Sequence, residues 1–377
     1  PPPPIGVTTY GIQGRAAHIP EDKWRGWPDV EVVGAVRLTG DREVRGIWMN
    51  EENSPSLNLN GHLLTVSDGG INAYYNESAP PIMGGEITSS RPFLTIRSGT
   101  YGSSQVDYRG NKIIQNLHIY SVIRDNDDHR VGLLVTGSHP EGERGRVSLT
   151  GDQANTFTGD VIVEGRMNTL HLNKSDGVTS ILGNIFVRKL ASVNIVSSDQ
   201  IADSSTVTLS ERAILSFSAE PKAIREKIHA LVVKEGTSRL SFYHSEGIRD
   251  NFKKTLILDD LLISDDGFLQ ISGWEAGRDH LLVRKDSEHL ADAFKKITID
   301  GWAKNQVYLK DYDKEYWSIE AAPEPSTYGA ILGAVGLGLV IYRKHRHRMR
   351  SACGEKLGGA ASPFKGSVAL RGLRSRR

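Results

Sequence analysis

The chain has 377 residues, of which 38% are hydrophobic, 24% charged and 7% aromatic. This length allows one large folded domain or two of ordinary size, with enough apolar surface for a core. A single cysteine, Cys353, excludes an intramolecular disulfide framework and any zinc site built from several cysteines. The 39 glycines and 15 prolines predict many turns.

The formal net charge of +1 hides an asymmetry along the chain. From Arg343 to the end, 11 lysines and arginines accompany one acidic residue, Glu355, so this segment carries +10. The preceding 342 residues therefore carry −9. Because an acidic body repels polyanions, we expect no nucleic-acid partner.

The N-terminus reads PPPPIG, which predicts an extended proline-rich linker. No basic segment followed by an apolar one is visible there, so we expect either a removed secretion signal or a fragment.

Near the C-terminus lies a distinctive segment, PEPSTYGAILGAVGLGLVIYRKHRHRMR, which begins at Pro323. Pro325 to Tyr342 is 18 residues without a charge, about 27 Å as a helix, against a hydrocarbon core of about 30 Å. We predict a single transmembrane helix with the acidic body outside and the basic end in the cytoplasm. A buried helix of a soluble domain is the alternative, but its many small residues would make a poor core face. The basic residues that follow the run are Arg343, Lys344, Arg346, Arg348 and Arg350.

These three parts, in this order, resemble the PEP-CTERM sorting signal of Gram-negative bacteria. The resemblance implies that Pro323, Glu324 and Pro325 form the motif at which an exosortase-type enzyme releases an exported protein from the inner membrane. The basic cluster would be the cytoplasmic stop. Family signals end at that cluster, whereas this chain continues for 27 residues (351–377), a tail that we expect to be disordered.

The body consists of short alternating runs between turn residues, such as FLTIRSG, GLLVTG, TLHLNKSDG and TLILDDLLISDDG. Period-two alternation punctuated by Gly and Asp predicts strands and turns, and so an all-β fold, either a sandwich or a solenoid. One segment, PKAIREKIHAL, places Ile224, Ile228 and Leu231 at helical spacing, and leaves helix, strand and turn open.

The segment VSLTGDQANTFTGDVIVEGRMNTLHLN (147–173) is similar to the autotransporter-associated β-strand repeat. The resemblance rests on Leu149-Thr150-Gly151, on Asn155-Thr156-Phe157-Thr158-Gly159 and on Gly165, with Asp160 in place of a second glycine. It implies a parallel β-helix, in which each coil adds a strand to the stack.

The expected organisation has five parts. They are a proline-rich, irregular entry segment (1–43), N-terminal solenoid coils (44–145), the repeat region with the solenoid cap (146–318), the sorting signal with its transmembrane helix (319–350) and the basic tail (351–377).

Two acidic clusters in the body are candidate sites. RDNDDHR (124–130) spaces Asp125 and Asp127 like calcium ligands, but Arg130 stands where the loop needs glycine, so we expect a solvated turn. DDLLISDDG (259–267) is interpreted as a coil or hairpin turn at Asp266-Gly267 before any pair of catalytic carboxylates.

Histidines and tryptophans give no clear site. His118 and His171 lie in alternating strands without a partner at ligand spacing, which favours ordinary surface or core residues. Trp274, Trp302 and Trp317 could stack on sugars, but we expect them to close the end of the stack.

We therefore expect a non-enzymatic, exported surface or extracellular-matrix β-solenoid, with no catalytic residue, cofactor or metal. Its expected partners are an exosortase-type enzyme, transiently the inner membrane, and exopolysaccharide or surface glycan. Two alternatives stay open: a glycan-binding adhesin, and a β-helix enzyme that degrades polysaccharide through clustered acids in a groove.

Overall fold

A computed structural model describes residues 19–50, 55–74, 80–99, 115–137, 145–244 and 252–321. Contacts divide the chain into two compact units, Pro1–Ala322 and Pro323–Arg377, and every described residue belongs to the first. Within these ranges the chain is almost entirely β-strand, with one short α-helix, α1 (Leu290–Phe294), and the 3₁₀ turns η1 (Glu21–Lys23) and η3 (Lys304–Gln306).

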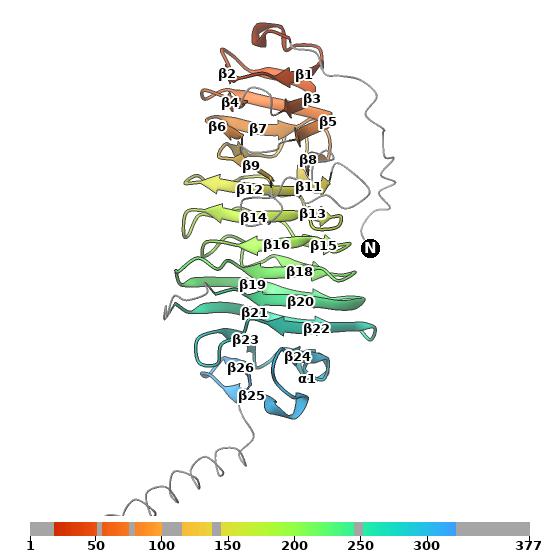
Figure 1. The fold of residues 1–377 in the computed structure, drawn as a ribbon, viewed down its shortest axis with the longest axis vertical. Helices are drawn as coiled ribbons and strands as arrows, with labels where there is room; N and C mark the ends of the chain where they lie inside the picture. The colour runs from red at the N-terminus through yellow and green to blue at the C-terminus, as the bar shows by residue number, and fades with distance from the viewer. Residues whose placement is uncertain are drawn as a thin grey trace, which may run out of the picture. The chain divides into compact units, whose positions relative to one another are not determined.

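The described strands form two long sheets that run side by side through the unit (Figure 1). Sheet A has 15 strands in the described residues: β1 (Asp29–Val32), β3 (Arg42–Asn50), β5 (Leu63–Tyr74), β7 (Glu86–Ser89), β8 (Phe93–Gly99), β10 (Val122–Ile123), β11 (Gly132–Gly137), β13 (Val161–Glu164), β15 (Ile185–Arg188), β17 (Thr206–Leu209), β19 (Ile224–Val233), β21 (Lys254–Ile263), β23 (His280–Arg284), β25 (Val307–Asp311) and β26 (Tyr316–Ala321). Sheet B has 11 there: β2 (Ala35–Arg37), β4 (Ser56–Asn58), β6 (Pro81–Met83), β9 (Gln115–Ile119), β12 (Gly145–Gly151), β14 (Thr169–Lys174), β16 (Ser192–Ile195), β18 (Ile214–Phe217), β20 (Gly236–Phe242), β22 (Gly267–Ser272) and β24 (Ile297–Ile299).

The chain alternates between the sheets and returns to each in parallel, which is a β-solenoid. In sheet A, Val161 pairs with Ile185, Ile185 with Val207 and Val207 with Leu231, so a coil there takes 22 to 24 residues. The predicted all-β fold of stacked parallel strands is thus confirmed. The ambiguous segment around Ile224 is a strand, β19.

The two ends of the described stack differ from the sequence-based expectation. The entry segment (1–43) was expected to be irregular, but β1 and β2 already pair with β3 and β4. The reason is that Val30 and Val32 alternate toward the core and are buried. At the other end, β26 pairs antiparallel with both β23 and β25, which stops the parallel repeat.

The core lies between the sheets and is built by alternation along each strand. In β14, Leu170 and Leu172 point inward and are fully buried, whereas His171 between them points outward. In the next coil Val193 and Ile195 occupy the matching register positions and are also fully buried. Each such side chain contributes about 1.5–3 kcal/mol relative to an exposed one.

A chain of buried polar side chains connects four successive coils, three of them at a turn and the fourth at the start of β19. We call it the internal polar ladder: Asn155, Ser180, Gln200 and Glu226. Asn155 Nδ2 donates to the Ser180 carbonyl (2.9 Å), and Ser180 Oγ donates to Gln200 Oε1 (2.8 Å). The backbone N–H of Gln200 donates to Glu226 Oε2 (2.9 Å), and that of Ile201 to Glu226 Oε1 (3.0 Å). The ladder therefore satisfies turn backbone groups that the sheets leave unpaired.

Glu226 ends this ladder in an unusual protonation state. Its side chain is fully buried, and burial, with a smaller effect from Asp199 and Asp203, raises the pKa of Glu226 to about 8. The two backbone hydrogen bonds oppose this rise without cancelling it. The folded chain thus holds a proton on Glu226 at pH values where the unfolded chain, with its ordinary carboxyl pKa, has released it.

The raised pKa of Glu226 makes the stability of the chain depend on pH. Because the folded pKa of Glu226 is raised, its contribution is fully present below pH 4.5 and is lost as the pH rises toward 8. Glu226→Gln should remove a component of about 1.4 kcal/mol per pH unit from the slope of unfolding free energy across this window. Urea denaturation at several pH values measures it.

The slope is the test, because glutamine also loses one hydrogen-bond acceptor and so lowers stability by itself. Glu211→Gln at an exposed position is the matched control and should keep the wild-type slope. An unchanged slope in Glu226→Gln would show that Glu226 is already ionised in the folded chain.

Candidate functional site

The residues expected to carry sorting, Pro323 to Pro325 and Arg343 to Arg350, lie outside the described residues. The same holds for the predicted transmembrane segment. Among the residues that the structure does describe, no helix has the length and apolar character needed to cross a bilayer. The candidate sites below therefore all belong to the solenoid.

Asp125, weighed as a calcium ligand, serves as a hydrogen-bond acceptor at a coil turn. Its Oδ1 accepts the backbone N–H groups of Val131 (2.7 Å) and Thr158 (2.9 Å), and its Oδ2 accepts the Thr158 hydroxyl (2.7 Å). Burial raises the pKa of Asp125, but these hydrogen bonds outweigh burial and hold the pKa below its usual value. Thr158 belongs to the repeat-like segment, and the neighbouring Phe157 is fully buried. The pattern NTFTG thus holds two coils together.

The paired acids at residues 259–267 are also engaged by neighbours. Asp260 accepts hydrogen bonds from Ser287 Oγ (2.5 Å) and from the His289 ring (2.7 Å), next to α1. Asp265 lies 3.1 Å from Lys296 Nζ. The turn at Asp266-Gly267 connects β21 of sheet A to β22 of sheet B, so it is the predicted coil turn and not a hairpin.

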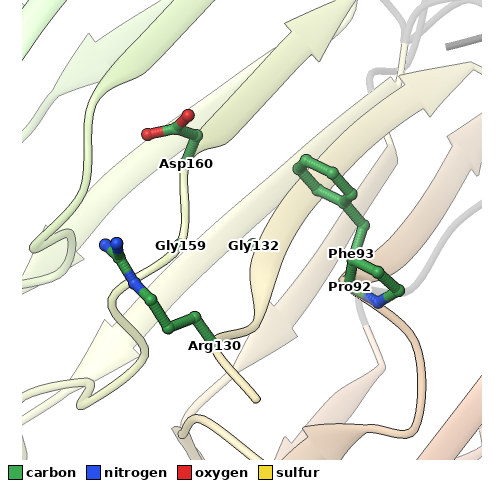
Figure 2. A pocket seen from close by; sticks show the side chains of 6 residues that line it. All are labelled: Pro92, Phe93, Arg130, Gly132, Gly159 and Asp160. Atoms are coloured by element: carbon green, nitrogen blue, oxygen red, sulfur yellow. The ribbon is translucent and has the colours of Figure 1, made fainter. Parts of the chain in front are cut away.

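A hollow of about 190 Å³ opens at the start of β8 and β11. Its lining residues are Pro92, Phe93, Arg130, Gly132, Gly159 and Asp160. Figure 2 shows Arg130 and Asp160 on one side of the two glycines and the Phe93 ring on the other. A Cβ on Gly132 would lie 2.6 Å from Phe93 Cε1, so glycine is what lets the ring lie against the strand.

This hollow is better explained by packing than by binding. Arg130 donates to both Thr158 Oγ1 (2.9 Å) and the Thr158 carbonyl, and Asp160 faces Asn184 Nδ2 at 3.4 Å. The volume also falls below the range of about 300–1,000 Å³ that ligand pockets usually have.

The three tryptophans lie in the last coils and contact the core. Trp274 is 9% exposed and meets Phe242 edge-on, with ring centroids 5.3 Å apart. Trp302 and Trp317 are partly buried against the same core, and Lys285 Nζ lies 4.9 Å from the Trp317 ring centre. This arrangement agrees with the expected cap and not with an exposed platform for sugars.

A buried hydrogen-bonded pair of side chains ties the end of β20 to the loop before β23. His244 Nε2 lies 2.9 Å from Asp279 Oδ2, which also accepts the Glu275 backbone N–H (2.8 Å). Asp279 is fully buried, and burial raises its pKa although His244 opposes the rise. A pair held this way joins two coils near the capped end of the stack.

The outward face of sheet B carries a different kind of cluster, which we call the Arg146 cluster: Tyr120, Arg146, Ser148, His118 and His171. Ser148 on β12 pairs in register with His118 on β9 and with His171 on β14, so the three share one outward column. Arg146 precedes Ser148 by two residues and projects from the same face. The Tyr120 ring stacks on His118, with centroids 6.0 Å apart and an angle of 23°.

Electrostatics within the Arg146 cluster keep both imidazoles neutral near pH 7. Burial lowers the pKa of His171 to about 3, helped by the positive charge of Arg146 and by His118. Burial and Arg146 also lower the pKa of His118. Arg146 itself has a pKa lowered by burial, and its Nε is shielded from solvent without a hydrogen-bond partner.

Sequence reasoning found the two histidines but not the cluster. His118 and His171 were interpreted as ordinary residues because they are 53 positions apart, and Arg146 was not singled out at all. The signal that brings them together is coil register, which becomes visible only when β9, β12 and β14 are aligned as neighbours.

Metal binding is tested by chelation. In the described ranges no group of three or more His, Cys, Asp or Glu side chains is placed to hold an ion, so EDTA should leave the melting temperature of the chain unchanged. Thermal melts with calcium and with EDTA measure this, and a fall of many degrees on chelation would reveal a metal site.

Asp125→Ala should lower the unfolding free energy by about 2–3 kcal/mol, because three hydrogen bonds to a carboxylate are lost. Urea denaturation of the variant and the wild type measures this difference.

Comparisons with protein families, with curated proteins and with solved structures find no match to this chain.

Proposed function

We propose that this chain is a non-enzymatic, exported β-solenoid that is sorted to the cell surface or extracellular matrix. The expected sorting segment was 319–350, but residues 319–321 belong to β26 of the solenoid, so in this proposal residues 323–350 hold the chain in the inner membrane, with the solenoid outside the cytoplasm. An exosortase-type enzyme then releases the solenoid by cutting at Pro323-Glu324-Pro325.

The observation that carries the proposal is the order of three features in the C-terminal sequence. A Pro-Glu-Pro motif is followed by the uncharged run, and the run is followed by five basic residues within eight positions. Charge separates the two sides, with −9 before Arg343 and +10 from Arg343 onward, which favours export of the body and retention of the tail. The prolines keep the approach to the helix extended, and a processing enzyme binds extended backbone.

The solenoid is compatible with life outside the cytoplasm. No cysteine precedes Cys353, so the body needs no reduced thiol to fold. Parallel coils extend by repetition, and each coil adds outward surface while burying its alternating apolar residues. Such a fold suits a surface protein that presents the outward surface of its coils to other molecules.

The enzyme alternative has less support. β-Helix hydrolases and lyases use clustered acids with a cation in a groove, whereas Asp125 and Asp260 accept hydrogen bonds from neighbouring groups at coil turns. The adhesin alternative has a specific observation in its favour, which is the Arg146 cluster on the outward face of sheet B.

Processing is tested by expressing the full chain, with an added secretion signal, in a host that has an exosortase and in a matched strain without it. Mass spectrometry of the mature protein should find a new C-terminus near Pro323 only in the first strain. Glu324→Ala, which alters the motif but leaves the helix and basic cluster intact, should block the cut and leave the chain in the membrane.

The control is Glu320→Gln, which removes the charge of an acidic residue just before the motif, keeps an oxygen for Lys310 Nζ (3.3 Å from Glu320 Oε2) and should be processed normally. If both strains retain the chain intact to Arg377, the sorting proposal fails and a permanent C-terminal anchor remains.

A further inference from the structure

We propose that the Arg146 cluster is a binding site for a glycan that carries an isolated carboxylate, such as a uronic acid linked to neutral sugars. Arg146 would pair with the carboxylate, and Tyr120, four register positions (about 13 Å) further along the strands, would pack against a neighbouring sugar of the same glycan. This inference rests on the proposed surface role, because it names the class of glycan that the displayed face would meet.

Arg146 lacks the partners that a largely buried arginine usually has. It is half-buried, its Nε is shielded from solvent without a hydrogen-bond partner, and no ion pair joins it to a carboxylate of the described residues. The chain treats a comparable cation differently: Arg42, which is 5% exposed, lies 2.6 Å from Glu21 and donates to three further oxygens. A desolvated guanidinium without a partner lowers stability, and a bound carboxylate would supply the missing partner in bidentate geometry.

The residues further along the same outward face suit the rest of a glycan. Tyr120 is 43% exposed and presents a flat apolar face next to His118. His118 Nδ1 lies 3.5 Å from Thr150 Oγ1, so an imidazole and a hydroxyl border the same face. A neutral imidazole both donates and accepts hydrogen bonds, as sugar hydroxyls require. One fixed cation, one aromatic face and neutral polar groups therefore match an acidic sugar within a mostly neutral glycan.

The net charge of the body indicates which kind of acidic glycan would bind, one with isolated carboxylates or one with closely spaced charges. The residues before Arg343 carry −9, which repels a chain of closely spaced charges. A single carboxylate meets one local cation and little of that repulsion. We therefore expect a heteropolysaccharide with spaced acidic sugars to bind better than a polyuronate.

The experiment compares three small probes on the purified full chain in detergent, by isothermal titration calorimetry. Cellobiouronic acid carries the carboxylate and the sugar, cellobiose carries the sugar alone, and acetate carries the carboxylate alone. The variants are Arg146→Gln and Tyr120→Ala. The controls are Arg239→Gln, an outward arginine of sheet B that faces Gln270 Oε1 at 3.3 Å, and Tyr243→Ala, a tyrosine 47% exposed.

We expect cellobiouronic acid to bind about tenfold more tightly than either partial probe, and Arg146→Gln to lose about tenfold in affinity. Tyr120→Ala should weaken binding severalfold, and both controls should bind like the wild type. The basic tail is present in every variant, so its contribution cancels. Without ligand, Arg146→Gln should melt at the same temperature as the wild type or higher, which separates lost binding from lost folding.

The inference would be overturned by no binding of cellobiouronic acid, by equal binding of cellobiose, or by unchanged binding after Arg146→Gln. Equal binding of acetate would remove the sugar from the assignment and overturn it as well. No exosortase takes part in this measurement, so a failed processing test leaves its result untouched, and a failed binding test leaves processing untouched.

Discussion

Parallel hydrogen bonding between successive coils determines where each side chain of the described body lies. Once a coil of 22 to 24 residues returns in register, inward positions meet inward positions and outward positions meet outward ones. A shift of one residue would turn Leu170 and Leu172 to solvent and His171 into the core. The same register that builds the apolar core therefore also aligns His118, Ser148 and His171 into one column.

Register also sets the polar chemistry of the interior. Turn backbone groups between the sheets have no strand partner, and the internal polar ladder of Asn155, Ser180, Gln200 and Glu226 meets that need coil by coil. The acid at the end of the ladder stays neutral near pH 7 because it is buried. The one acid of the ladder is thus neutralised by its burial.

The outward face of sheet B follows a different rule. Arg146 is shielded from solvent at its Nε, yet the described residues provide no acid for it. A largely buried guanidinium without a hydrogen-bond partner at its Nε is a candidate for function, since stability alone would not favour it. Tyr120 and the neutral imidazoles of His118 and His171 lie on the same outward face, so the candidate site is confined to this part of sheet B.

Much of the fold could be predicted from the sequence, because alternation in runs such as TLHLN and punctuation by Gly and Asp report strand and turn directly. The early strands β1 and β2 were missed because DVEVVGAVR follows a proline-rich start. The antiparallel end and the Arg146 cluster could not be predicted, because both depend on which distant strands become neighbours. The role of Asn155 and Thr158 was visible as a repeat pattern but not as a set of hydrogen bonds.

Engineered disulfides test directly whether successive coils pair in this parallel register. Thr169 and Ser192 lie on adjacent coils with their hydroxyl oxygens 2.8 Å apart. Ile214 occupies the same column one coil further on, about 9.6 Å from Thr169 by strand spacing, which is too far for a disulfide. The double variant Thr169→Cys/Ser192→Cys is made in the full chain with Cys353→Ser, and Thr169→Cys/Ile214→Cys serves as its control.

After mild oxidation, free thiols are counted by mass spectrometry under denaturing conditions. The solenoid register predicts a nearly complete disulfide in the first pair and free thiols in the second. Equal oxidation of both pairs, or free thiols in the first, would contradict the register on which the fold and the Arg146 cluster depend.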